Sequence, residues 1–251
     1  MVRIERYDHI CSLLREYQYL SVKRLAKLLY VSEATIRRDL KYLSDAGLIR
    51  RTFGGAALIE GMYADIPLVV RDEEHTKEKE VIAAIAAQLI KDGDVIIIDS
   101  SSTLFKLIPH LQRRTNTVIT NSPKVAMALT ENPGIEVYST GGKLRDNSIS
   151  YVGRAAENMI ADCNCDTMFF SSKGIDRNQL TDTSEDEARL KVAMMRRSKC
   201  IVAMHDSSKF DKVAFSKICG LDKLDYLITD KDPGDAWKKA AERYGFRLLF
   251  P

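Results

Sequence analysis

The chain has 251 residues, 45% hydrophobic and 29% charged, which are the proportions of a globular protein that buries a core. It has no run of 18 apolar residues and no apolar signal region at its N-terminus, so we expect a cytoplasmic protein without a membrane span. Its five cysteines lack Cys-x-x-Cys spacing and no cofactor-binding motif occurs, so we expect reduced thiols, no metal and no cofactor.

The formal net charge of +3 lies mainly in the first sixty residues. These hold 11 Lys and Arg against 7 Asp and Glu, a local +4, whereas the rest of the chain is close to neutral at −1. A polyanion would therefore bind near the N-terminus. We predict a small domain over residues 1–60, a linker over 61–76 and a larger domain over 77–251, because the segment around Gly61 and Pro67 lacks strong periodicity.

Three helical patterns lie in the first sixty residues. The first is amphipathic and runs through Ile4–Leu14. The second covers 23–29, with Ser21 as its N-cap, and the third begins after Ser32 and continues to about Asp45. A short turn joins the second and third patterns, which is typical of a helix-turn-helix.

Two β-like runs follow the third helix, at 48–51 and 57–59. The glycine pair between them, Gly54-Gly55, allows a hairpin turn. Three helices followed by a basic hairpin form a winged helix, in which the arginines of the hairpin are placed to touch phosphates.

The third helix has the residue pattern of a DNA major-groove reader. Ile36, Leu40 and Leu43 recur at helical spacing and form a buried stripe, which leaves Thr, Arg and Lys on the other faces. The alternative is a solvated basic face on an ordinary helix. Arg37 and Arg38 lie about 100° apart on the helix, so we expect one to reach a base and the other a phosphate, in an order that remains open. The candidate DNA-binding residues are Ser32, Thr35, Arg37, Arg38, Lys41, Arg50 and Arg51.

This part of the chain resembles the DNA-binding domain of the DeoR family of bacterial regulators. The matching positions are Leu25-Ala26, Val31-Ser32, Thr35 to Leu40, Leu43, Gly47 and Gly54-Gly55-Ala56. The family usually has His before the wing glycines, where this chain has Phe53. The resemblance implies binding to double-stranded operator DNA, as a homo-oligomer that matches repeated half-sites.

Beyond the linker, short apolar runs alternate with helical patterns. The candidate strands are 95–98, 117–120, 135–139, 167–171, 200–204 and 226–229. The candidate helices begin near Lys77 and at 104–111, 124–130, 154–160, 184–197 and 235–244. Such alternation predicts an α/β domain with a largely parallel sheet.

Polar residues follow most of these strands. Ligands of parallel sheets bind beyond the carboxyl ends of the strands, so we expect these residues to converge on a phosphorylated sugar or polyol. Taken singly, each is also the kind of residue that caps a helix or forms a turn. The candidate effector-binding residues are Asp99, Ser100, Ser101, Ser102, Thr103, Thr120, Asn121, Gly141, Gly142, Lys173, Gly174, Asp176 and Lys209.

The same region resembles the effector domain of the DeoR family, which shares its fold with the ribose-phosphate isomerases. The family usually has Gly in the loop position that Ser101 occupies here. If that backbone needs a positive φ, the loop must be reshaped, because Ser adopts such a conformation reluctantly. The matching positions are Asp99, Ser102-Thr103, Thr120-Asn121, Gly141-Gly142, Ser150, Gly153, Lys173-Gly174, Lys191, Asp206 and 208–210.

The alternative function is a sugar-phosphate isomerase with an appended DNA-binding domain. Such an enzyme needs a carboxylate base, and the isomerases carry an Asp-Gly-Ala-Asp-Glu cluster. The corresponding residues 173–177 read Lys-Gly-Ile-Asp-Arg, in which only Asp176 is acidic, so we predict no catalytic residue. We expect a transcription regulator that represses sugar or polyol genes and is released from operator DNA by a phosphorylated sugar.

Overall fold

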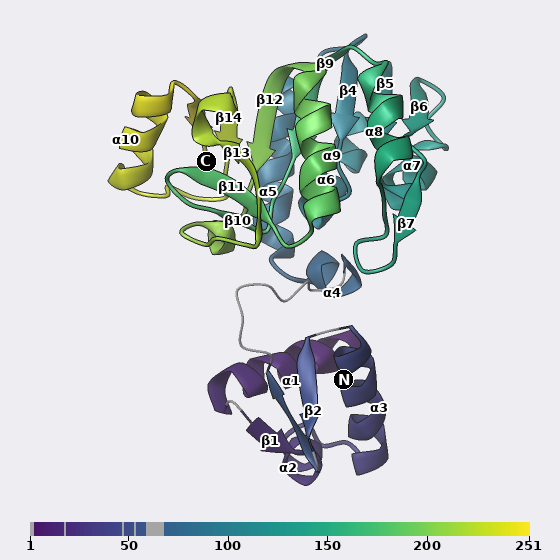
Figure 1. Cartoon of the computed structure of the whole chain (residues 1–251), viewed down its shortest axis with the longest axis vertical. Coiled ribbons are helices and arrows are strands. Elements are labelled where there is room, and N and C mark those ends of the chain that lie inside the picture. The colour runs from purple at the N-terminus through teal and green to yellow at the C-terminus, as the bar shows by residue number, and fades with distance from the viewer. Residues whose placement is uncertain (1–2, 18, 47, 53, 59–67) are drawn as a thin grey trace. The chain divides into compact units, whose positions relative to one another are not determined.

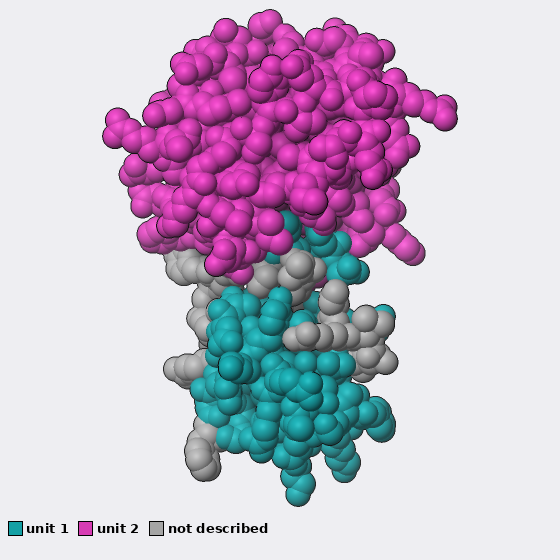
Figure 2. Space-filling view, turned by 90° about the vertical axis from the view of Figure 1, so that its right-hand side faces the viewer, with its two compact units in different colours: residues 1–73 teal, residues 74–251 magenta. Residues whose placement is uncertain are grey.

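The computed structural model describes residues 3–17, 19–46, 48–52, 54–58 and 68–251. The chain forms two compact units, Met1–Glu73 and Glu74–Pro251, coloured separately in Figure 2. The boundary between them falls inside the predicted linker. Gly61 and Pro67, which marked that linker in the sequence, lie outside the described residues, as do Gly47 and Phe53.

The first unit is a winged helix (Figure 1). Its strands form an antiparallel sheet in the order β1-β3-β2, so the wing hairpin gains a third strand from the link between the first two helices. That third strand was not predicted, because it has three residues and is formed by pairing with a segment more than thirty residues away. The elements are α1 (Arg3–Tyr17), β1 (Tyr19–Ser21), α2 (Val22–Leu28), α3 (Glu33–Asp45), β2 (Ile49–Thr52), β3 (Gly55–Leu58) and α4 (Leu68–Glu73).

Local sequence signals account for the N-termini of α2 and α3. The Ser21 hydroxyl accepts a hydrogen bond from the Arg24 N–H at 3.2 Å, and Ser32 accepts one from the Thr35 N–H at 3.1 Å. Both predicted N-caps are therefore confirmed. The apolar faces behind these caps meet in one core, whose fully buried side chains include Ile10, Leu14, Leu25, Ile36, Leu40 and Leu43.

The second unit is built on a seven-stranded parallel sheet in the order β15-β14-β12-β9-β4-β5-β6. The predicted α/β domain with a largely parallel sheet is confirmed. Its strands are β4 (Val95–Ile98), β5 (Asn116–Thr120), β6 (Ile135–Ser139), β9 (Cys165–Phe170), β12 (Ser198–Met204), β14 (Tyr226–Ile228) and β15 (Arg247–Leu249). The edge strand β15 was not among the predicted strands.

Helices cover both faces of this sheet, so its strands alternate between two cores. In β9, Met168 and Phe170 point into one core while Phe169 points into the other. Residues of α8, α9 and α10 line the first core, and residues of α5, α6 and α7 line the second. The helices are α5 (Thr76–Ala86), α6 (Ser102–Phe105), α7 (Pro123–Leu129), α8 (Arg154–Ala161), α9 (Glu185–Arg196) and α10 (Asp235–Tyr244).

Two small antiparallel sheets complete the second unit. One is the hairpin of β7 (Lys143–Arg145) and β8 (Ser150–Val152). The other has the order β10-β11-β13, from β10 (Gly174–Ile175), β11 (Gln179–Asp182) and β13 (Ser216–Gly220). Four short 3₁₀ turns occupy Ala87–Leu89, Ile108–Leu111, Ser207–Lys209 and Leu221–Lys223. The single helix predicted at 104–111 is thus α6 followed by a separate 3₁₀ turn.

Replacing Phe169 with Ala should lower the free energy of unfolding of the second unit by about 3–5 kcal/mol, because this fully buried ring would leave a cavity in the centre of the sheet. The fluorescence of the buried Trp237 follows the transition during urea unfolding. The matched control is Met127→Ala on α7, where the side chain is 73% exposed and we expect a change within about 0.5 kcal/mol. Equal effects of the two changes would contradict the assigned core.

Candidate functional site

The outer face of α3 carries the predicted DNA-binding residues. Arg37, Arg38 and Lys41 are exposed, because Ile36, Leu40 and Leu43 turn into the core. The Ser32 and Thr35 hydroxyls lie 2.9 Å apart at the N-terminus of the helix and cap it. Arg51 is exposed on β2, whereas the side chain of Arg50 lies outside what the structure describes.

Asp39 does not face outward with the arginines of its own helix. Its carboxylate is buried against α1, where it accepts two hydrogen bonds from Arg6, one from Nε at 2.5 Å and one from Nη2 at 3.1 Å. This hydrogen bonding raises the pKa of Arg6. One turn further along α3, the Tyr42 ring stacks on Tyr7 of α1 with centroids 4.8 Å apart. Arg6 thus holds α3 in place against α1.

No local sequence pattern indicates this role of Arg6. Arg6 contributes to the positive charge of the first sixty residues, but its guanidinium forms an ion pair with Asp39 and does not face solvent. The partners are 33 residues apart, so no helical spacing relates them. Asp39 orients an arginine of another helix and does not lie on the surface.

Four neighbouring strands of the large sheet, β12, β9, β4 and β5, bring their following loops to one edge. Asp99 follows β4, Asn121 follows β5, Ser171 and Ser172 follow β9, and His205 follows β12. All of these side chains are buried. The predicted convergence at the carboxyl ends is therefore present for the residues directly after these strands.

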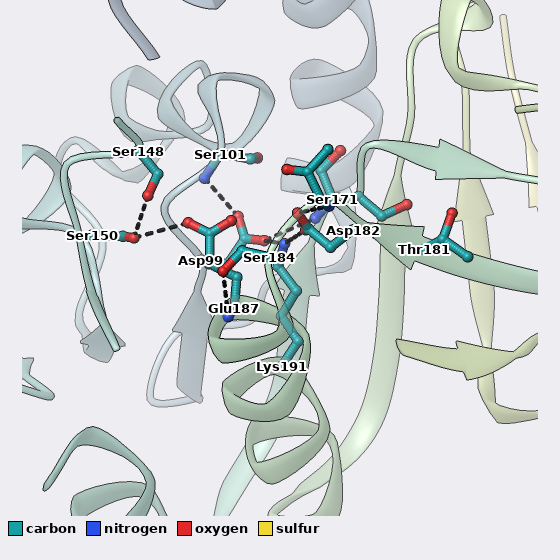
Figure 3. Close-up of polar contacts among 12 residues, drawn as sticks. Asp99, Ser101, Ser148, Ser150, Ser171, Thr181, Asp182, Ser184, Glu187 and Lys191 are labelled. Atoms are coloured by element: carbon teal, nitrogen blue, oxygen red, sulfur yellow. Dashed lines mark hydrogen bonds and ion pairs between the residues drawn. The ribbon is translucent and has the colours of Figure 1, made fainter. Parts of the chain in front are cut away.

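Asp99 organises this edge rather than presenting its carboxylate to solvent (Figure 3). It accepts hydrogen bonds from the backbone N–H groups of Ser101, at 2.8 Å, and of Ser171, at 3.1 Å. It therefore joins the loops after β4 and β9. Burial raises the pKa of Asp99, although the nearby Lys191 opposes the shift.

Lys191 on α9 lies between two buried carboxylates (Figure 3). Its ammonium is 2.6 Å from an oxygen of Asp182 and 3.7 Å from an oxygen of Asp99. Burial alone would raise the pKa of Asp182, but Lys191 and then Lys173 lower it. Burial would likewise lower the pKa of Lys191, but Asp182 and Asp99 raise it, so the ammonium stays charged.

A second chain of buried polar groups joins α9 to the β7–β8 hairpin (Figure 3). The Ser150 hydroxyl donates to Glu187 at 2.9 Å and lies 2.7 Å from the Ser148 hydroxyl. Arg145 of β7 is 3.7 Å from the same carboxylate oxygen. Sequence reasoning did not single out Ser148, Asp182 or Glu187, because each looks like an ordinary loop or helix residue until the fold brings them together.

The loop after β4 is unstrained at Ser101. Its φ is −76°, in the extended region, and its hydroxyl accepts a hydrogen bond from the Leu104 N–H at 3.2 Å. The conditional expectation of a reshaped loop does not apply, because this backbone needs no positive φ. Ser100 of this loop is buried, as are Ser102 and Thr103 at the start of α6.

The two glycines after β6 adopt backbone conformations that favour glycine. Gly141 and Gly142 have φ values of +57° and +110°. A Cβ on Gly142 would lie 2.8 Å from the Val152 carbonyl oxygen, so the start of the β7–β8 hairpin requires glycine there. This explains the two glycines structurally without a ligand.

Asp176 stabilises a turn. Its carboxylate accepts hydrogen bonds from the backbone N–H groups of Asn178, at 2.8 Å, and Gln179, at 2.9 Å, and so closes the β10–β11 connection. Gly174 is buried at the start of β10. Lys173 lowers the pKa of Asp182, and Lys209 lowers the pKa of Asp206, so both lysines act on carboxylates of this edge.

Three buried polar atoms at this edge accept or donate no hydrogen bond within the described residues. They are Oδ1 of Asn121, Nδ1 of His205 and Oδ2 of Asp206. His205 accepts the Ser172 N–H at Nε2, 2.9 Å away, and burial lowers its pKa to about 3, so the ring is neutral. Thr120 uses its hydroxyl to accept the Ser122 N–H.

Comparison with known proteins gives the family. The model of the DeoR-like helix-turn-helix domain matches residues 6–61, and that of the DeoR C-terminal sensor domain matches residues 74–231. The chain belongs to the DeoR family of helix-turn-helix transcriptional regulators. The family predicted from the sequence motifs is confirmed.

Full-length relatives of this DeoR-family chain are regulators. An uncharacterized HTH-type transcriptional regulator, YulB of Bacillus subtilis, is 37% identical over 96% of this chain and 94% of its own length. The repressor GlcR of the same organism is 32% identical over 99% and 96%. The lactose phosphotransferase system repressor of Staphylococcus epidermidis is 30% identical over 92% and 94%. The prediction of a regulator rather than an isomerase is confirmed.

Among solved structures, ribose 5-phosphate isomerase A from Methanocaldococcus jannaschii is similar to this DeoR-family protein with a TM-score of 0.41. The identity is 17% over 55% of each chain. A likeness of this size is too low to transfer a ligand or an activity. Within the described residues, no helix is long and apolar enough to cross a membrane, and no group of His, Cys, Asp and Glu is arranged to hold a metal ion.

Replacing Asp39 with Asn should destabilise the first unit by about 3 kcal/mol, because it removes the negative partner of a buried guanidinium. Hydrogen exchange of the α3 amides in the full chain measures this, and the amides of the sensor domain are the internal control. The double change Arg6→Met with Asp39→Leu should recover most of the loss, since it removes both charges. Unchanged α3 exchange in Asp39→Asn would show that the pair does not support the helix.

Replacing Lys191 with Met should destabilise the sensor domain by roughly 3–5 kcal/mol at neutral pH, because Asp99 and Asp182 would be buried without their cation. The pKa of Asp182 is lower in the folded protein than in the unfolded chain, so its carboxylate stabilises the fold at pH values above the ordinary carboxyl pKa. This stabilisation is lost as the pH falls through the folded-state pKa. The stability difference between wild type and variant should therefore shrink on acidification. Urea unfolding followed by Trp237 fluorescence at several pH values measures it. Lys199→Met, which breaks an exposed pair with Asp166, is the matched control.

Proposed function

We propose that this protein represses genes for sugar or polyol use and that a phosphorylated sugar releases it from operator DNA. The DNA-binding part follows from the family, and the full-length relatives include two named as repressors, one of them of a lactose phosphotransferase system. Operator binding takes place in the cytoplasm, and a homo-oligomer presents two heads to repeated half-sites.

The observation that supports a polyol-like effector is the set of three unsatisfied polar atoms on Asn121, His205 and Asp206. Buried polar groups normally have hydrogen-bond partners, so unpaired ones indicate a ligand or ordered water. Two of these atoms are acceptors. A neutral His205 that accepts at Nε2 carries its proton on Nδ1 and is a donor. Sugar hydroxyls both donate and accept, so they can bond to atoms of either kind.

Charge at the same edge favours a phosphate on that sugar. Lys209 interacts with Asp206, one of the three unsatisfied groups, and Lys173 interacts with the buried Asp182. A phosphorylated ligand would therefore place its anion near Lys209 and Lys173 and its hydroxyls near Asn121 and His205.

A thermal-shift screen of sugar phosphates against the full chain tests this proposal. A sugar phosphate present at 100 times its dissociation constant should raise stability by about 2.7 kcal/mol. The shift should be lost in Asn121→Ala and Lys209→Ala but kept in Lys239→Ala, an exposed lysine on α10. The same compound should release wild-type protein from DNA. Stabilisation by unphosphorylated sugars only, or equal shifts in all variants, would contradict the proposed ligand.

A further inference from the structure

The faces of α3 are divided between three environments within its own domain. Its α1 face is occupied by Asp39 and Tyr42, which contact Arg6 and Tyr7. Its wing face carries Arg37 and Leu40, which line a small hollow together with Val22, Arg51, Thr52, Gly54 and Gly55. The remaining face points away from both.

We propose that Arg38, together with Ala34 and Lys41, reads base edges, whereas Arg37 and Arg51 together clamp one backbone phosphate. This assignment rests on DNA binding by the domain and goes beyond it, because it divides two adjacent arginines between specificity and affinity. It does not depend on the identity of the effector.

Helix geometry places the three reading residues on one stripe. Ala34, Arg38 and Lys41 are spaced i, i+4 and i+7, so they lie on one face, and all three are exposed. At about 100° per residue, this stripe lies opposite the buried Ile36, Leu40 and Leu43. It is therefore the part of α3 that would project furthest into a major groove.

Arg38 and Lys41 are available on that stripe. Neither makes an ion pair within the described part of the chain. A guanidinium can bond the two acceptors of guanine, and a methyl such as that of Ala34 fits against a thymine methyl.

Arg37 is held on the wing side. Its guanidinium is 3.3 Å from the Glu33 carboxylate one turn earlier, along the helix rather than outward. The hollow beside it has a volume of about 40 Å³. That is room for roughly one water or one phosphate oxygen. Because Arg37 and Arg51 lie at the rim from different elements, a phosphate there would bridge α3 and the wing.

The experiment selects binding sequences from randomised double-stranded DNA with the full-length protein and then measures the salt dependence of binding to the selected duplex. Arg38→Ala should lose base preference at one or two positions. Arg37→Ala and Arg51→Ala should keep the selected sequence, bind more weakly by about tenfold, and lower the salt slope by about 1 each. Lys239→Ala on α10 is the control and should change neither quantity.

Two further variants separate the roles. The double change Arg37→Ala with Arg51→Ala should lower the slope by about 1 rather than 2, because both side chains serve one phosphate. Arg37→Lys should keep most of the affinity, whereas Arg38→Lys should not restore the base preference, since Lys lacks the planar fork. Circular dichroism of each variant confirms folding.

The opposite pattern would overturn the assignment: an altered selected sequence in Arg37→Ala, or an unaltered one in Arg38→Ala. Additive slope losses in the double variant would show that the two arginines contact separate phosphates. A wild-type protein that enriches no sequence would contradict DNA reading itself and this assignment with it. Failure to respond to any sugar phosphate would affect only the proposed effector.

Discussion

The buried ammonium of Lys191 holds the sensor domain together at the edge where its loops meet. It reaches Asp182, at the end of β11, and Asp99, at the end of β4, from the middle of α9. Asp99 in turn binds the backbone of the loop after β9. One cation thus ties a helix, the small antiparallel sheet and two loops of the large sheet. Removing such a partner leaves charges in a medium that cannot solvate them, so the arrangement tolerates little change.

The DNA-binding domain uses the same physical device on a smaller scale. The Arg6–Asp39 pair links α1 to the middle of α3, and the Tyr7–Tyr42 stack repeats the link one turn later. Both contacts occupy one side of α3, so they set which residues are left to face outward. The position of Arg38 and Lys41 on the outer stripe is therefore a consequence of what is buried against α1.

Much of the site chemistry is local and could be read from the chain. Ser21 and Ser32 cap helices because the residue types and the apolar stripes behind them leave few alternatives. The loops after β4, β5 and β9 lie at one edge because parallel strands end there, and Asp99 after β4 contacts the loop after β9. Asp176 is different: its residue type suggested a ligand, but only the β10–β11 turn shows that its carboxylate is occupied by backbone N–H groups.

Residue types and their local spacing were enough to predict the family, the winged helix and the α/β class, because helical spacing, caps and strand ends are properties of neighbouring residues. Which charged groups pair inside the protein became clear only from the fold. The Arg6–Asp39 pair joins residues 33 positions apart, and Lys191 meets Asp99 from another element altogether. Such pairs depend on the packing of distant elements and leave no local pattern, so the role of each charge became visible only in the fold.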